Sequence, residues 1–187
     1  MNYTESLRQV SDYMVSFFTN HHNAEIVYHN QAHTLALVDA VNRITADSAL
    51  DERSSFIVLS AAWFYDSGYF VNGADSPKIK SASLAAEFIK SIGVEEADIN
   101  EVKECITVTN MPQSPQTETQ KIICDAALYY LGTESFSEKS KLLRKETESL
   151  TKIKIRGADW RVKSIAMFEA HNYFTEYCKT HIEKTKQ

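Results

Sequence analysis

The sequence lacks any long apolar run and any recognisable export signal. No segment approaches the roughly 18 consecutive apolar residues that a membrane-spanning helix needs. The first residues, Met1 to Glu5, have neither a basic flank nor an apolar signal segment. We therefore expect a soluble, cytoplasmic protein with no membrane partner.

Cysteine is also scarce. The chain of 187 residues has three cysteines, Cys105, Cys124 and Cys178, which are an odd number and lie far apart. This pattern has neither the close pairs of a zinc site nor the even count of a disulfide framework. We expect reduced thiols that lie in the core or at its edge.

An excess of positive charge is absent as well. The 20 Lys and Arg residues are outnumbered by 25 Asp and Glu residues, which gives a formal net charge of -5 at pH 7. A broad nucleic-acid surface needs clustered basic residues. The composition therefore argues against such a surface.

The feature that dominates the chain is helical periodicity. Apolar residues recur at spacings of three and four, and strand-like alternation is nearly absent. With 43% hydrophobic residues the chain is long enough for a sizeable core. We predict an all-α, single-domain bundle of seven to eight helices over residues 1–187. The first predicted helix follows the capping pattern Asn2-x-x-Glu5, the second runs from Asn30 to Ile44, and the central third helix runs from Glu52 to Asp66. The fourth is closed by Gly93, the fifth has its start signal at Asp98, and the sixth runs from Thr117 to Gly132. A seventh runs from Ser135 to Leu150, and a long last helix runs from Asp159 to Ile182.

Two of the three prolines lie between Asn110 and Thr117, which predicts a loop there.

Three segments contain the candidate metal-ligating or catalytic residues. They are Tyr28-His29-Asn30-Gln31-Ala32-His33-Thr34, Ala61-Ala62-Trp63-Phe64-Tyr65-Asp66-Ser67-Gly68-Tyr69, and Asp125 within an apolar helical stretch. His29 and His33 are four residues apart, so on a helix they would share one face. An ionised Asp125 in apolar surroundings is costly unless it is paired, hydrogen-bonded or bound to a metal. Either a metal site or a bond to a backbone or basic partner would explain it.

In their order and spacing these segments resemble the HD-domain metal-dependent phosphohydrolases, and the resemblance spans residues 20 to 180. It implies an HD-type helical fold with His33, Asp66 and Asp125 as metal ligands, and catalytic roles for Asp66 and for His29, which would orient the site or touch the substrate. The implied cofactor is a divalent metal, Mn²⁺, Fe²⁺, Mg²⁺ or Zn²⁺. The implied partner is a small phosphorylated molecule or a nucleotide. The segments Arg144-Lys145-Glu146 and His171 to Thr175 also look like parts of small bacterial members.

The chain departs from this family at the histidine of the His-Asp doublet, which is Tyr65 here. A neutral phenol is a poor ligand at neutral pH. Three alternatives follow: a weakened metal site of the three remaining ligands, a rearranged site that recruits His29, or a pocket that has lost the metal. We predict that Tyr65→His raises metal affinity and, if the rest of the pocket is intact, creates or increases phosphohydrolase activity.

A second departure adds positive charge. The run Pro77-Lys78-Ile79-Lys80 stands where the family often has acidic residues or histidine. Ammonium and guanidinium groups bind phosphate through charge-assisted hydrogen bonds. We predict Lys78, Lys80 and Arg144 as substrate contacts, with a solvated helix face as the alternative.

The predicted function is hydrolysis of a phosphate ester by a metal-bound hydroxide. A catalytically silent module that binds an anionic ligand through its lysines is the alternative, and Tyr65 discriminates between the two. A third hypothesis is a helical interaction protein with a partner on the helix Ser135 to Leu150. A large exposed apolar patch would favour that hypothesis.

Overall fold

Helices carry the whole architecture of this computed structural model, which describes residues 1–46, 48 and 50–185. Over those residues it contains nine α-helices and three 3₁₀ helices and no strand. The all-α prediction is confirmed, and the predicted number of helices was slightly too low. The elements are α1 (Tyr3–Asn20), α2 (Gln31–Thr45), α3 (Glu52–Phe64), η1 (Ser67–Phe70), α4 (Pro77–Ser91), α5 (Glu96–Thr107), α6 (Glu118–Ala127), η2 (Tyr129–Gly132), α7 (Phe136–Thr151), α8 (Gly157–Ala170), α9 (Glu176–His181) and η3 (Glu183–Thr185).

The predicted caps at Asn2 and Thr117 are confirmed, and Asn30, predicted only as the start of a helix, caps α2 in the same way. The side chains of Asn2, Asn30 and Thr117 each accept a hydrogen bond from a backbone N–H three residues further on. Such caps satisfy donors that the first helical turn leaves without a partner. Gly93 follows α4 with a φ of 80°, in the left-handed region expected for a glycine that closes a helix.

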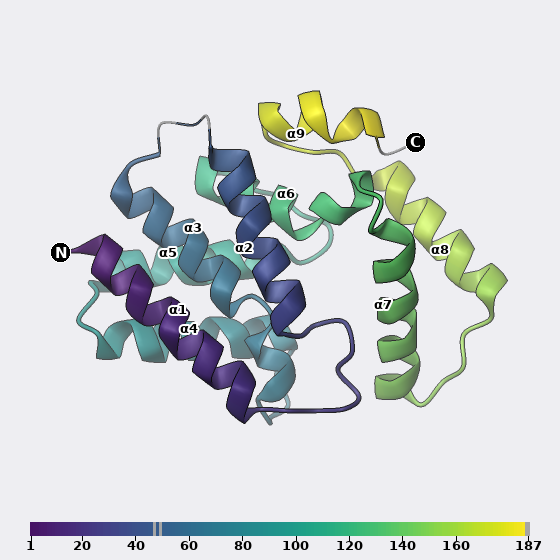
Figure 1. The fold of residues 1–187 in the computed structure, drawn as a ribbon, viewed down its shortest axis with the longest axis horizontal. Helices are drawn as coiled ribbons and strands as arrows, with labels where there is room; N and C mark the ends of the chain where they lie inside the picture. Colours follow the sequence, from purple (N-terminus) through teal and green to yellow (C-terminus); the bar gives the residue numbers. More distant parts are fainter. Residues whose placement is uncertain (47, 49, 186–187) are drawn as a thin grey trace.

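Helix α3 lies at the centre, as its nearly continuous apolar sequence predicted. It packs against α1, α2, α4, α5 and α6, and Figure 1 shows it enclosed by these helices. Phe56, Ile57 and Phe64 on this helix are almost fully buried. One connected core joins α3 to residues as distant as Val10 and Ile182.

The predicted start of α5 and the predicted end of α3 were wrong. Helix α5 starts at Glu96 rather than at Asp98, because the Asp98 carboxylate accepts hydrogen bonds from Tyr3 and Arg53 instead of capping the helix. Helix α3 ends at Phe64, and Gly68 lies in η1. A Cβ at Gly68 would lie 1.9 Å from the Pro77 carbonyl oxygen, so this glycine permits the close contact between η1 and α4.

The predicted last helix, Asp159 to Ile182, is two helices. Residues 171–175 are not helical, and Thr175 has extended backbone (φ -81°, ψ 149°) and caps α9. The local helical pattern does not reveal this break. The break depends on hydrogen bonds to a residue of α6, which is far away in the sequence.

Helices α7 and α8 lie side by side at one edge of the molecule (Figure 1). The only buried residue of α7 is Glu146, and α8 has none. None of the described helices is long and apolar enough to cross a membrane.

Candidate functional site

The structure brings two of the predicted site residues, His33 and Asp66, into direct contact. His33 lies in the first turn of α2, where its backbone N–H donates to the Asn30 side chain at 3.1 Å. Asp66 lies between α3 and η1 and is fully buried. His33 Nδ1 and Asp66 Oδ2 are 2.6 Å apart. The aspartate therefore holds the orientation of the imidazole ring.

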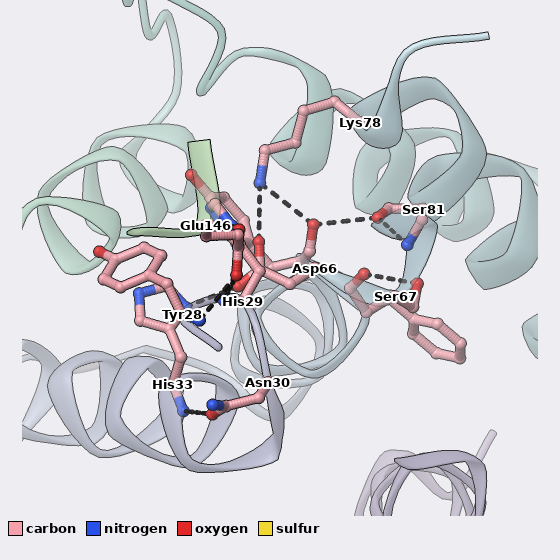
Figure 2. A network of polar contacts seen from close by, with 12 residues as sticks. Tyr28, His29, Asn30, His33, Asp66, Ser67, Lys78, Ser81 and Glu146 are labelled. Carbon is pink, nitrogen blue, oxygen red and sulfur yellow. Dashed lines mark hydrogen bonds and ion pairs between the residues drawn. The ribbon is translucent and has the colours of Figure 1, made fainter. Parts of the chain in front are cut away.

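Lys78 approaches Asp66 from the opposite side, as Figure 2 shows. Its ammonium lies 3.4 Å from Asp66 Oδ1 and donates to the Tyr65 carbonyl oxygen at 3.1 Å. The same ammonium lies over the face of the Tyr65 ring, an arrangement that the negative potential of the ring face favours. Lys78 was predicted to contact a substrate phosphate, but the structure directs its charge inward.

The charges of this cluster stabilise one another. Burial alone favours the neutral acid, but Lys78 and the two histidines hold the pKa of Asp66 below its usual value. Burial lowers the pKa of Lys78 to about 8, and the attraction of Asp66 limits that decrease. At pH 7 the pair is therefore an ammonium and a carboxylate.

His29 belongs to a second cluster, centred on Glu146 of α7. Glu146 Oε2 accepts hydrogen bonds from the backbone N–H groups of Tyr28, at 2.6 Å, and His29, at 3.1 Å. Its other oxygen bonds to His29 Nδ1, and the His29 ring stacks on Tyr69 with centroids 3.9 Å apart. Burial opposes the charge of Glu146, but the bonds from His29 and Tyr28 hold its pKa below the usual value.

Sequence reasoning missed Glu146 as a site residue. It lies in a helix that looked charged and solvated, and its only signal was the segment Arg144-Lys145-Glu146 of the family resemblance. The side chain is nonetheless 2% exposed. It ties α7 to the segment that enters α2, next to His33 (Figure 2).

Asp125 serves a different contact. Its Oδ1 accepts from the Phe174 backbone N–H at 2.9 Å, and its Oδ2 accepts from the N–H and hydroxyl of Thr175 at 2.8 and 2.6 Å. Burial raises the pKa of Asp125, although these bonds oppose the shift. Asp125 thus bonds to the non-helical segment between α8 and α9. This contact corresponds to the alternative in which Asp125 is bonded to the backbone. Its metal-binding role stays a prediction.

The donor set does not fit a divalent metal in this arrangement. Both oxygens of Asp66 are engaged by His33 and Lys78, and both oxygens of Asp125 accept hydrogen bonds. Among the residues that the structure describes, no group of three or more His, Cys, Asp or Glu side chains is placed to hold a metal ion. A metal would also meet the Lys78 ammonium beside Asp66.

The other two predicted substrate contacts are engaged within the fold. Lys80 Nζ donates to the Val71 carbonyl oxygen at 2.7 Å. Arg144 bonds to Glu148 within α7 and to the Ile155 carbonyl oxygen on the connection between α7 and α8. Neither residue lines the cavity that borders His33.

That cavity has a volume of about 450 Å³ and opens between α2, η2 and the start of α7. This size falls within the range of small-molecule sites. The residues that line it are His33, Ala36, Leu37, Asp39, Arg43, Ala126, Ala127, Tyr129, Tyr130, Thr133, Glu134, Ser135 and Lys139. Its wall therefore combines apolar and aromatic surface with two basic residues, two acidic residues and four residues that carry a hydroxyl group.

No family model, curated protein or solved structure matches this chain.

Proposed function

We propose that this chain is an HD-like domain in which the lysine ammonium of Lys78 takes the place of the metal, and that it binds a small phosphorylated molecule in the cavity beside His33 without metal-dependent hydrolysis. The observation that carries the first part is the contact of Lys78 with both Asp66 and the Tyr65 ring. A buried carboxylate needs a cation or several donors. Lys78 and His33 supply them, so Asp66 does not need a metal for its charge.

The two departures from the family pattern complement each other physically. An imidazole at position 65 would offer a nitrogen ligand to a metal, whereas the Tyr65 ring offers a face on which the Lys78 ammonium rests. Lys78 then neutralises the adjacent carboxylate. Both changes favour a resident ammonium group over a metal ion.

Lys139 supports an anionic ligand in the cavity. It is half-buried, and burial lowers the pKa of its ammonium. Across the described part of the chain, this ammonium makes no hydrogen bond or ion pair, and it lies 5.6 Å from the centre of the Tyr130 ring. Glu138 attracts this ammonium without bonding to it, and a half-buried cation gains from an anion that bonds to it directly. A phosphate group in the cavity would supply that anion.

Other groups on the wall suit the same ligand. The cavity reaches the N-terminus of α7, which no side chain caps, and such helix ends attract anions. Arg43 adds a guanidinium group to the wall, whereas the hydroxyls of Thr133 and Ser135 already bond to the Tyr130 carbonyl oxygen and to each other. Two acidic residues share the wall, but Asp39 is already paired with Arg43 at 2.7 Å.

A binding experiment with a matched control tests the cavity. Wild type, Lys139→Met and Lys141→Met are titrated calorimetrically with inorganic phosphate and with a panel of sugar phosphates and nucleotides, at constant ionic strength. Lys141 is an exposed residue of the same helix that does not line the cavity. We expect at least one probe to bind, about 10–100-fold more weakly to Lys139→Met, since a charge-assisted hydrogen bond contributes about 1.5–3 kcal/mol. Equal binding by both variants, or no binding by wild type, would refute the proposal.

Metal analysis separates this proposal from the hydrolase that the resemblance implies. Protein purified without chelator is assayed for metal content and for phosphate release with Mn²⁺, Fe²⁺, Mg²⁺ and Zn²⁺. We expect neither stoichiometric metal nor turnover. Stoichiometric metal that disappears in Asp125→Ala, together with turnover, would restore the metal-dependent phosphohydrolase.

A further inference from the structure

Helix α8 has apolar side chains on two sides but packs on only one. Trp160 Nε1 donates to the Ser140 hydroxyl of α7 at 2.9 Å, and the Phe168 ring meets Phe136 with centroids 4.6 Å apart. These contacts define the inner side of α8. No residue of α8 is buried, and the helix lies at the outer edge of the molecule beside α7 (Figure 1).

The outer side carries an apolar stripe. Val162 is 67% exposed and Ile165 is 50% exposed, and exposed Ala158 and Ala166 share their side of the helix. These positions follow the spacing of three and four residues that places side chains on one helical face. Apolar side chains gathered on an exposed helix face can mark a contact with a protein partner.

Charges at the two ends of the stripe indicate what that partner is. Arg161 and Glu169 are both exposed, and neither makes an ion pair or hydrogen bond in the described part of the chain. They lie four residues before and four residues after Ile165, about 6 Å along the axis on either side. A face with a positive end, an apolar centre and a negative end is complementary to itself when two copies run antiparallel.

We propose that α8 pairs antiparallel with α8 of a second copy of this chain, across a two-fold axis near Ile165. In this arrangement Arg161 of each copy lies opposite Glu169 of the other, and Val162 and Ile165 lie in the centre. Two-fold interfaces use the same patch on both subunits, so a single self-complementary helix is sufficient. This inference does not depend on the ligand proposed for the cavity beside His33.

The size of the face predicts a weak dimer. A helix of 14 residues is about 21 Å long, so one helix pair gives an interface at or below the about 1,200 Å² lower limit of stable complexes. We therefore expect dissociation constants in the micromolar range, on the order of 1–100 μM. Monomer and dimer should both be present at ordinary laboratory concentrations.

Sedimentation equilibrium over a concentration series tests the face. We expect wild type to dimerise and Val162→Asp to weaken the dimer at least tenfold. The matched control is Val15→Asp, because Val15 on α1 is also exposed, at 42%, and should leave dimerisation unchanged. Circular dichroism verifies that both variants are folded. A monomer at every concentration, or equal effects of the two variants, would overturn the proposal.

Charge reversal tests the antiparallel arrangement. Arg161→Glu and Glu169→Arg should each weaken the dimer about 3–10-fold, because each creates two like-charge contacts across the axis. The double variant restores opposite charges and should dimerise within about twofold of wild type. Failure of the double variant to recover would exclude this pairing of the helices.

Discussion

Replacement of Lys78 by methionine is the sharpest test of the charge arrangement around Asp66. Methionine keeps most of the unbranched side chain of lysine but removes the ammonium, so the change leaves no large cavity. Asp66 then loses the cation 3.4 Å from its Oδ1, while His33 remains 2.6 Å from its Oδ2. The carbonyl oxygen of Tyr65 also loses a donor.

The magnitude follows from burial. Asp66 is fully buried and the Lys78 side chain is 15% exposed, so solvent cannot replace the lost cation effectively. Removal of one partner of a buried ion pair costs about 3–5 kcal/mol. Because His33 still engages one oxygen, we expect a loss of about 3 kcal/mol in the free energy of unfolding. At about 2–4 °C per kcal/mol for a chain of this size, the melting temperature should fall by about 6–12 °C.

Lys80→Met is the matched control, since it removes a lysine two residues away on the same helix. Lys80 donates to one carbonyl oxygen and forms no ion pair with any described carboxylate, so we expect a loss of about 1 kcal/mol. Urea unfolding of both variants gives the comparison. Adding Asp66→Asn to Lys78→Met should cost much less than it does in wild type, because the two residues interact directly. Equal losses for the two lysine variants, or additive effects in the double variant, would refute the reasoning.

Two further predictions concern the other buried carboxylates. Asp125→Asn should lower the free energy of unfolding by about 1–3 kcal/mol, because at least one donor from residues 174–175 loses its acceptor. Hydrogen exchange should accelerate at the Thr175 and Cys178 amides. The control is Asp12→Asn, in an exposed pair with Arg8, which should change stability by less than about 1 kcal/mol. Glu146→Gln should cost about 2 kcal/mol at pH 7. The folded-state pKa of Glu146 is lowered. The stabilisation that its charge provides is therefore complete above the unfolded pKa of about 4.3 and is lost as the pH falls through the lower folded pKa. If the difference in the free energy of unfolding between Glu146→Gln and wild type stays constant down to the acid transition, this assignment is contradicted.

The features that were predictable from the sequence are those set by neighbouring residues. The caps at Asn2, Asn30 and Thr117 form between residues three apart, and the centre of α3 follows from its own apolar composition. The family resemblance predicted that His33 and Asp66 are ligands of one metal, whereas the structure joins them by a direct hydrogen bond. Local patterns therefore predicted most helices, and the role of the site residues as metal ligands stays a prediction.

The features that were missed depend on partners far away in the chain. Glu146 and His29 are 117 residues apart, and Asp125 bonds to residues 49 and 50 positions further on. Helical periodicity cannot reveal that an acidic residue on a charged helix is buried, nor that a bond from α6 interrupts the last helix. The direction of Lys78 was likewise not readable, because a lysine in the first turn of a helix is most often solvated.

The position of Lys78 changes what substitution of Tyr65 should do. Tyr65→His adds a nitrogen ligand, but the Lys78 ammonium still lies against Asp66, so we expect no gain in metal affinity from that change alone. Lys78→Ala removes the competing cation and leaves the space bordered by position 65 and Asp66 Oδ1. The variant with both changes should therefore retain metal, with an imidazole added to the existing His33 and Asp66.

Metal content of wild type, the two single variants and the double variant, measured after identical purification, tests this expectation. Stoichiometric metal in the double variant alone would show that ammonium and metal compete for one position. Metal in Tyr65→His alone would mean that Lys78 does not block the site, and a folded double variant without metal would mean that position 65 does not face the ligands. Since all four proteins keep the Asp66 carboxyl group, differences among them report on which cation the site accepts.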